Sequence, residues 1–198
     1  MLKALPAPMK GVFNYTALAL NTVTLCTPLF AFSGLKLLPV APLQKMSSRA
    51  CITIAETWIG INSQFLQSTQ ETQYHITGDL DKVNYDGWYM VIANHQSWAD
   101  IFVLQKIFNR RAPFLKFFLK KELIYVPVIG LCWWALDFPF MKRYSKELLA
   151  KHPELKGKDL ETTRKACEKF KYTPVSIMNF LEGTRFTDDK RKRQQSPY

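Results

Sequence analysis

The sequence predicts an α/β fold, with a largely parallel sheet flanked by helices and an N-terminal helical segment that associates with a membrane. Apolar runs of strand length alternate with helical patterns through the later part of the chain, which favours a parallel sheet. Nearer the N-terminus, no charged residue occurs between Lys10 and Lys36. The 198-residue length suits one domain with an anchor. We therefore assign a membrane-anchoring segment to residues 1–68 and an α/β domain to residues 69–198.

The uncharged stretch from Gly11 to Leu35 is the predicted anchor. A helix needs about 20 apolar residues to cross a bilayer, and this stretch is long enough. Polar residues are expensive inside a membrane and Pro28 would break a helix, so we expect a kinked span or a re-entrant pair of half-helices. A core helix of a soluble protein is the alternative. A cleaved signal peptide is disfavoured because the run is long and no small-residue cleavage site stands out after it.

Periodicity and turn residues place the remaining elements. Apolar residues at steps of three and four from Met46 to Phe65 predict a second helix after Pro42. Lys45 and Arg49 beside that stripe are placed to meet lipid headgroups. The predicted strands are Thr72–Thr77, Trp88–Ala93, Phe114–Leu119, Asp137–Met141 and Val175–Leu181. The predicted helices between them begin at Trp98, Pro127, Ser145 and Asp159.

A polar segment, Asn94–Asp100, follows the strand predicted at Trp88–Ala93. His95 and Asp100 are five residues apart, about 140° out of register on a continuous helix, so they meet only if His95 lies in a turn ahead of the helix. Ser97 is a suitable N-cap, and Asp100 stands where a capping box has its acid. The pair then resembles a catalytic triad without its serine, with a substrate hydroxyl as nucleophile. The alternative is a capping box beside an uninvolved histidine.

A second polar block, Glu182-Gly183-Thr184-Arg185, follows the last predicted strand. Together with the earlier His-x4-Asp block at His95 and Asp100, it resembles the PlsC-type glycerophospholipid acyltransferases, in which these two blocks occur in this order. The detailed residue pattern of two segments, Asn94–Asp100 and Lys120–Leu123, is similar to that of the bacterial YihG branch and of lysocardiolipin-type acyltransferases.

The same family carries a middle block, with an aromatic residue three positions before an arginine. Phe140 and Arg143 fit it, and Asp137 stands where the family usually has glycine. The family also has a further apolar, proline-containing block after the second polar block, whereas this chain ends at Tyr198. We therefore expect a C-terminally incomplete acyltransferase domain.

The resemblance implies an acyltransferase that moves a fatty acyl group from a thioester to a lysophospholipid, foremost 1-acylglycerol-3-phosphate, giving phosphatidic acid. Acyl-CoA or acyl-carrier protein would be the donor, with no metal or tightly bound cofactor. His95 and Asp100 would be the catalytic residues. The substrate-binding residues would be Arg143, Glu182, Gly183, Thr184 and Arg185. Arginine suits a lysophospholipid phosphate because its guanidinium can grip two oxygens at once.

The three polar clusters, at His95, Arg143 and Glu182–Arg185, each follow a predicted strand. The carboxyl ends of parallel strands form the edge of the sheet where ligands bind. We therefore expect the clusters to converge on one site, whatever the family. Backbone amides near the start of the helix after His95 are plausible donors to an oxyanion.

The net charge of +11 and the pI near 9.5 call for an anionic partner. The aromatic fraction of 14%, with five tryptophans, favours membrane phospholipids over nucleic acid. Lys116, Lys120 and Lys121 form a solvated face or steer the phosphates of the acyl donor. The charged run Asp188–Arg193 is typical of a solvated loop. Oligomeric state is not predicted.

Four widely spaced cysteines have no metal-binding or redox spacing and indicate free thiols in a reducing compartment. With the resemblance, this places the protein in the bacterial inner membrane, with the active site facing the cytoplasm. A non-catalytic, basic, membrane-associated lipid-binding protein on an acyltransferase-like scaffold is the alternative function. Core packing, the wall of an acyl-chain groove and a membrane-interface belt are open interpretations for Leu131, Trp133, Trp134 and Phe138.

Overall fold

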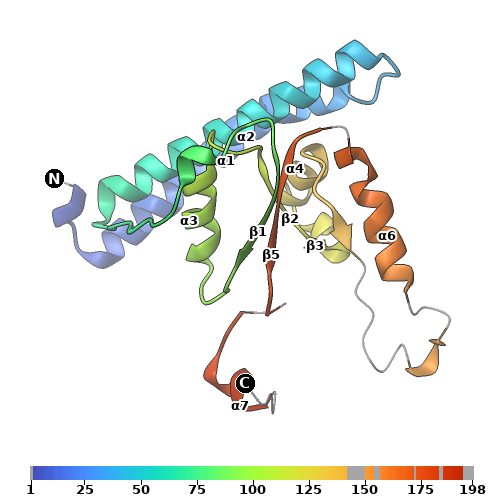
Figure 1. The fold of residues 1–198 in the computed structure, drawn as a ribbon. Helices are drawn as coiled ribbons and strands as arrows, with labels where there is room; N and C mark the ends of the chain where they lie inside the picture. The colour runs from blue at the N-terminus through green and yellow to red at the C-terminus, as the bar shows by residue number, and fades with distance from the viewer. Residues whose placement is uncertain (1, 142–149, 154–156, 172, 183–184, 194–198) are drawn as a thin grey trace.

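In the computed structural model, two long helices cross one end of a small parallel sheet (Figure 1). The structure describes residues 2–141, 150–153, 157–171, 173–182 and 185–193. The helices and single helical turns in chain order are η1 (Leu2–Ala4), α1 (Ala7–Leu35), α2 (Ala41–Thr69), η2 (Leu80–Lys82), α3 (Ala99–Phe108), η3 (Lys121–Tyr125), α4 (Ile129–Ala135), α6 (Lys158–Cys167), η5 (Glu168–Lys171) and α7 (Asp188–Arg193). The strands are β1 (Trp88–Ala93), β2 (Leu115–Phe117), β3 (Leu119–Lys120), β4 (Phe140–Met141) and β5 (Val175–Phe180).

The main sheet has the order β1-β5-β2, and both pairings are parallel. β1 and β5 are in full register, from Trp88 opposite Val175 to Ala93 opposite Phe180. A second parallel pair is formed by β3 and β4. The predicted α/β class with a parallel sheet is therefore confirmed, and the strands predicted at Trp88–Ala93 and Val175–Leu181 are present almost to the residue.

The N-terminal helices form an antiparallel hairpin joined by polar contacts. Asn14 Nδ2 donates to Thr69 Oγ1 at 2.8 Å, and Asn21 Nδ2 donates to Asn62 Oδ1 at 2.7 Å. The expected pair of half-helices is wrong, because α1 runs unbroken through Pro28. Pro28 removes one backbone hydrogen bond from α1 but does not end the helix. Among the described helices, α1 alone is long and apolar enough to cross a membrane.

Other predicted elements differ from the structure. The alternation at Thr72–Thr77 forms no strand, because none of the described strands pairs with it. The predicted strand Phe114–Leu119 is divided between β2 and β3, which belong to different sheets. The charged run Asp188–Arg193 is helix α7 and not a loop. The helix predicted at Ser145 lies outside the described residues.

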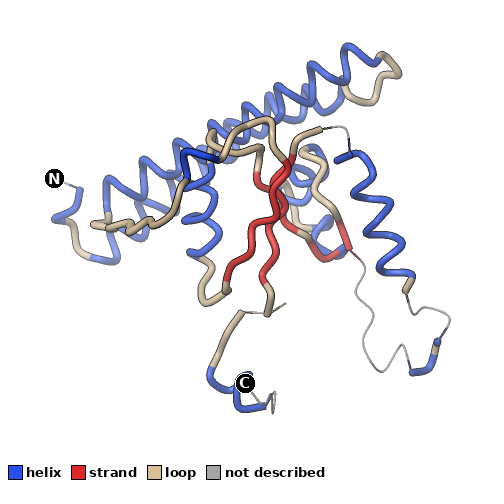
Figure 2. Tube along the Cα trace, in the orientation of Figure 1, coloured by secondary structure: helices blue, strands red, loops and turns tan. Residues whose placement is uncertain are grey.

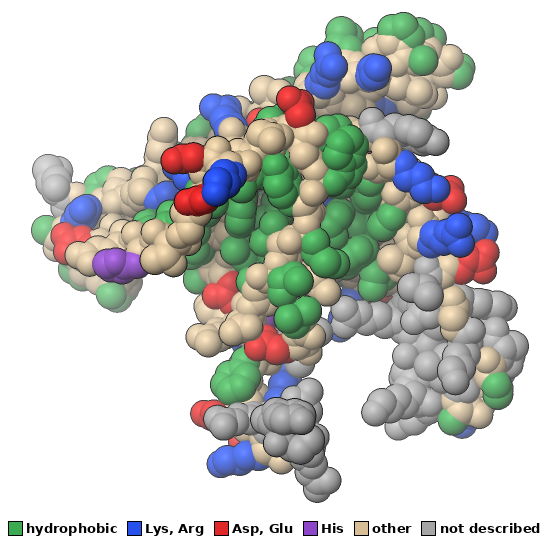
Figure 3. Space-filling view, in the orientation of Figure 1, with side chains coloured by type: hydrophobic (Ala, Val, Ile, Leu, Met, Phe, Trp, Pro, Cys, Tyr) green, Lys and Arg blue, Asp and Glu red, His purple; other side chains and the backbone are tan. Residues whose placement is uncertain are grey.

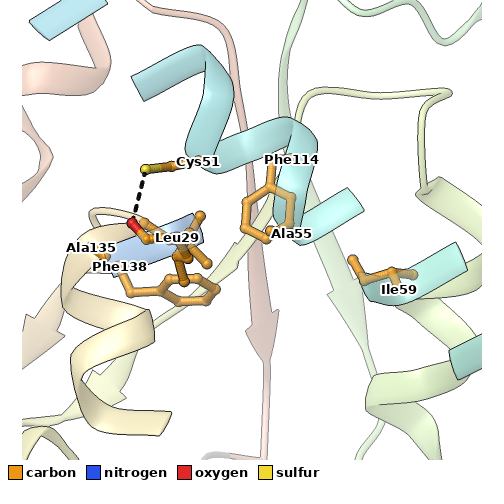
Figure 4. Close-up of a cluster of buried hydrophobic side chains, with 8 residues drawn as sticks. Leu29, Cys51, Ala55, Ile59, Phe114, Ala135 and Phe138 are labelled. Atoms are coloured by element: carbon orange, nitrogen blue, oxygen red, sulfur yellow. Dashed lines mark hydrogen bonds between the residues drawn. The ribbon is translucent and has the colours of Figure 1, made fainter. Parts of the chain in front are cut away.

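The hairpin and the sheet share one apolar core. Leu29 of α1 and Ala55 of α2 belong to the same buried cluster as Phe114 and Phe138, which flank the strands (Figure 4). Figure 2 shows the hairpin lying across the end of the sheet opposite the exits of β1 and β5. The helices therefore help to define the interior that lies behind the candidate site.

Candidate active site

His95 lies in the turn between β1 and α3, as predicted, and Asp100 lies in the first turn of that helix. The distance from His95 Nδ1 to Asp100 Oδ2 is 3.1 Å. The histidine side chain is 12% exposed and the aspartate 26%, so the pair is partly shielded from solvent. A carboxylate at Nδ1 holds the imidazole in one orientation and leaves Nε2 available as a base.

Backbone amides fix the Asp100 carboxylate. Its Oδ2 accepts the N–H of Gln96 at 2.7 Å and the N–H of Ser97 at 2.8 Å. Helix α3 begins at Ala99, with Trp98 at the N-cap in place of the predicted Ser97. The Ser97 N–H nevertheless donates to the Asp100 carboxylate, as in a capping box. Ser97 Oγ accepts the N–H of Ala99 at 3.1 Å.

These contacts determine the ionisation of Asp100. Partial burial raises its pKa, but hydrogen bonds from the Ser97 N–H, from His95 and from the Gln96 N–H outweigh burial, so the pKa lies below its ordinary value. Asp100 is therefore a carboxylate at neutral pH. The same amides are unsuited to the predicted oxyanion role, because those of Gln96, Ser97 and Ala99 already donate within the turn.

The end of β5 holds His95 from the other side. Phe180 stacks on the imidazole with ring centroids 4.1 Å apart. Glu182 Oε2 accepts the His95 N–H at 2.8 Å, and the Phe186 N–H donates to His95 O at 2.7 Å. The resemblance implied that Glu182 binds substrate; in the structure its carboxylate accepts the backbone N–H of His95.

A cavity of about 630 Å³ opens beside His95 and is lined mainly by apolar side chains. Its walls include Leu25 and Leu29 of α1, Trp58 of α2 and Trp133 of α4. This volume is within the range of about 300–1,000 Å³ that is usual for small-molecule sites. The hairpin therefore forms part of the same cavity as His95.

Among the described residues, three cationic side chains also line this cavity, namely Lys120, Arg185 and Lys190. Arg185 was predicted to bind substrate. Lys190 was not, because it lies in the charged run expected to be a loop; its Nζ donates to Arg185 O at 3.0 Å. No sequence signal distinguishes it from its charged neighbours.

The structure brings together His95, Asp100, Glu182 and Arg185 of the predicted site residues. Arg143, Gly183 and Thr184 lie outside the described residues. Within the described ranges, no three His, Cys, Asp or Glu side chains cluster where they could hold a metal ion. The described cysteines at positions 26, 51, 132 and 167 are all free thiols.

A family model described as "Acyltransferase" matches residues 73–196, which is more than half of the chain. The chain therefore belongs to the acyltransferase family. No curated protein and no solved structure matches it significantly. Family membership indicates an enzyme that transfers an acyl group from a donor to an acceptor.

Proposed function

We propose that this acyltransferase moves a fatty acyl group from acyl-CoA or acyl-carrier protein to the free hydroxyl of a lysophospholipid. The proposed acceptor is 1-acylglycerol-3-phosphate and the product phosphatidic acid. The observation that carries the proposal is the position of the His95–Asp100 pair beside an apolar cavity that is also lined by cations. On the resemblance of Asn94–Asp100 and Lys120–Leu123 alone, we propose the same acceptor class as in the YihG branch.

The proposed chemistry uses His95 as general base. Nε2 takes the proton of the acceptor hydroxyl while the oxygen attacks the thioester carbonyl carbon and forms the new C–O bond. The C–S bond then breaks, and the imidazolium returns the proton to the leaving thiolate. Asp100 stabilises the imidazolium through Nδ1. The serine of a triad is replaced by the substrate hydroxyl.

The positively charged side chains that line the cavity suit an acceptor that carries a phosphate group. Arg185 and Lys190 come from the segment after β5, and Lys120 comes from β3, so two separate parts of the chain supply positive charge to one cavity. A phosphomonoester beside His95 would be held by these charges while its glycerol hydroxyl reaches Nε2. On the resemblance alone, we propose Arg143, Gly183 and Thr184 as further binding residues.

The apolar part of the cavity is the proposed site for an acyl chain. Leu25, Leu29 and Trp58 extend this surface from the sheet into the hairpin. Burial of methylene groups against such a surface is favourable, at about 0.8 kcal/mol for each CH₂. A long-chain thioester would thus bind with its chain among the helices and its carbonyl near His95.

The membrane is the proposed source of the acceptor. Helix α1 exposes large apolar side chains along its outer surface, including Val12, Leu20 and Val23. Buried polar contacts with α2 satisfy the asparagines that the sequence places within the apolar stretch. We propose that α1 associates the enzyme with the bacterial inner membrane, with the active site facing the cytoplasm.

The test is acyl transfer by the detergent-solubilised chain from labelled palmitoyl-CoA to 1-acylglycerol-3-phosphate or to monoacylglycerol, which lacks the phosphate. We expect labelled phosphatidic acid, and a kcat/KM for monoacylglycerol lower by about tenfold or more, because its phosphate contacts are lost. Equal use of both acceptors would contradict phosphate recognition. Binding of 1-acylglycerol-3-phosphate without turnover would indicate the non-catalytic alternative.

A further inference from the structure

Between β3 and the end of α4, the chain exposes a run of large apolar side chains. Tyr125 is 80% exposed, Leu131 52% and Trp134 45%, and Val126 and Val128 are also exposed. We name these five residues the α4 apolar surface. Leu131 and Trp134 are therefore not core residues, whereas Phe138 is buried. Val128, Leu131 and Trp134 recur every third residue, which places them on one side of the short helix.

The opposite side of the same helix lines the cavity. Ile129, Cys132 and Trp133 face the interior that also contains His95. One thin element thus separates the cavity from the α4 apolar surface. A molecule bound against the outer side of α4 would be one helix diameter from the acyl site.

Helix α4 is also attached to the apolar helix α1. Cys132 Sγ lies 3.1 Å from Cys26 Sγ, and Lys36 Nζ donates to Ala135 O at 2.9 Å. Helix α4 is therefore held against the helix that we propose to contact the bilayer. This attachment to α1 distinguishes the α4 apolar surface from Trp88, Met90 and Ile92, which are exposed on β1. Figure 3 shows that apolar side chains also gather over the strands.

Composition favours lipid as the occupant. The surface combines a tyrosine and a tryptophan with aliphatic residues, and these aromatic side chains prefer the boundary between headgroups and acyl chains. Lys120 and Lys121 are exposed beside it, accompanied by one acid, Glu122. Cations at this position complement the phosphates of an anionic bilayer.

We propose that the α4 apolar surface is a second membrane contact, seated in the headgroup region of the bilayer that receives α1. This inference rests on the proposed function, since the bilayer is taken as the source of lysophospholipid. It adds a route by which lipid moves around α4 into the cavity without crossing bulk water.

The test uses the full chain in vesicles of phosphatidylcholine and phosphatidylglycerol that carry tritiated phospholipid. Leu131 is replaced by the photoreactive amino acid benzoylphenylalanine, and a matched protein carries the same replacement at Met90, which is 65% exposed on the sheet face. After irradiation, we expect several-fold more lipid adduct at position 131 than at position 90. Equal labelling, protein–protein adducts at position 131, or failure of the chain to bind vesicles would overturn the proposal.

Activity separates this inference from the proposed function. We expect Leu131→Asp to raise the apparent KM for lysophospholipid in vesicles several-fold while leaving turnover in detergent micelles unchanged, and Met90→Asp to change neither. Lipid adducts at position 131 without acyl transfer would retain the membrane contact and refute the function. Acyl transfer without lipid adducts at position 131 would support the function and refute the membrane contact.

Discussion

At the residue scale, His95 owes its position to contacts of two kinds. Asp100 is a local partner, and its approach follows from the turn that Ser97 helps to form. Phe180 and Glu182 are distant partners, reached only because β1 and β5 lie side by side. The local contact was predictable from spacing and capping chemistry. The strand pattern also predicted that the His95 and Glu182 segments meet, but not the particular bond, because a sequence pattern does not show which carboxylate meets a backbone amide 87 residues away.

The Asp100 carboxylate makes stability depend on pH in a defined direction. Its pKa in the folded chain is below the ordinary 3.8, so the folded state binds the proton less tightly than the unfolded state. Its contribution is fully present above pH 3.8 and is lost as pH falls through the lower folded-state value. We expect the difference in free energy of unfolding between the wild type and Asp100→Asn to shrink as pH falls below about pH 4. Urea unfolding of both proteins across that range measures it, and a difference that grows in acid would contradict the assignment.

Glu182 provides a second residue-scale prediction. If Glu182 positions His95 through the backbone, Glu182→Ala should lower kcat by about tenfold with little change in KM. The reason is that the imidazole would no longer be held in the correct orientation toward the substrate hydroxyl. Glu182→Gln retains an oxygen that can accept the His95 N–H and should restore most of the turnover. Steady-state kinetics of both variants provide the measurement. A rise in KM with unchanged kcat in the alanine variant would instead indicate direct substrate binding.

At the scale of elements, a predicted strand formed where its sequence was mainly apolar and a described strand lay beside it to pair with. Val175–Phe180 forms a central strand with neighbours on both sides, and its mainly apolar sequence, interrupted only by Ser176 and Asn179, made it recognisable. Thr72–Thr77 alternates just as clearly but has no strand to pair with. Asp137 has a φ of 58°, a left-handed conformation that favours glycine. This backbone conformation would suit the glycine that the resemblance implies at this position. Lys36 Nζ lies 2.8 Å from the Asp137 carboxylate and stabilises the exception.

The turn before α4 stores backbone strain. Val128 has φ 64° and ψ −60°, and the N–H of Ile129 donates to Pro127 O at 2.7 Å across it. A β-branched residue is disfavoured in this conformation by about 1–3 kcal/mol. We therefore expect Val128→Gly to stabilise the protein by about 1 kcal/mol after the entropy cost of glycine. Val126→Gly is the control, because Val126 has an ordinary φ of −67°. This variant should have a lower free energy of unfolding than the wild type. Equal losses in chemical unfolding would show that the turn is unstrained.

At the scale of the whole molecule, the hairpin and the α/β domain form one cavity. Sequence patterns assigned α1 to an anchor, and they contain no signal that Leu25 and Leu29 would line the space beside His95. Tertiary packing alone brings these residues together. The same reason explains why Lys190 was overlooked, since a lysine at a cavity resembles a solvated lysine in sequence.

The contact between Cys26 and Cys132 tests this packing. Their thiols lie 3.1 Å apart on α1 and α4, so oxidation by copper phenanthroline should remove two hydrogen atoms and join them in a disulfide. Burial raises the pKa of the Cys132 thiol, so the reaction should be slow at neutral pH and faster in alkali. Peptide mapping identifies the linked pair, and Cys132→Ser abolishes it. A link between other cysteines would show that α1 packs differently.

The most direct test of the central claim, that His95 is the base of an acyl-transfer site, is the rate of acyl transfer to 1-acylglycerol-3-phosphate by the wild type, His95→Ala and His75→Ala. His75 is an exposed histidine outside the site and serves as the matched control. We predict that His95→Ala lowers kcat by about 10²- to 10⁴-fold while His75→Ala retains wild-type turnover. Equal turnover in all three proteins would contradict the account.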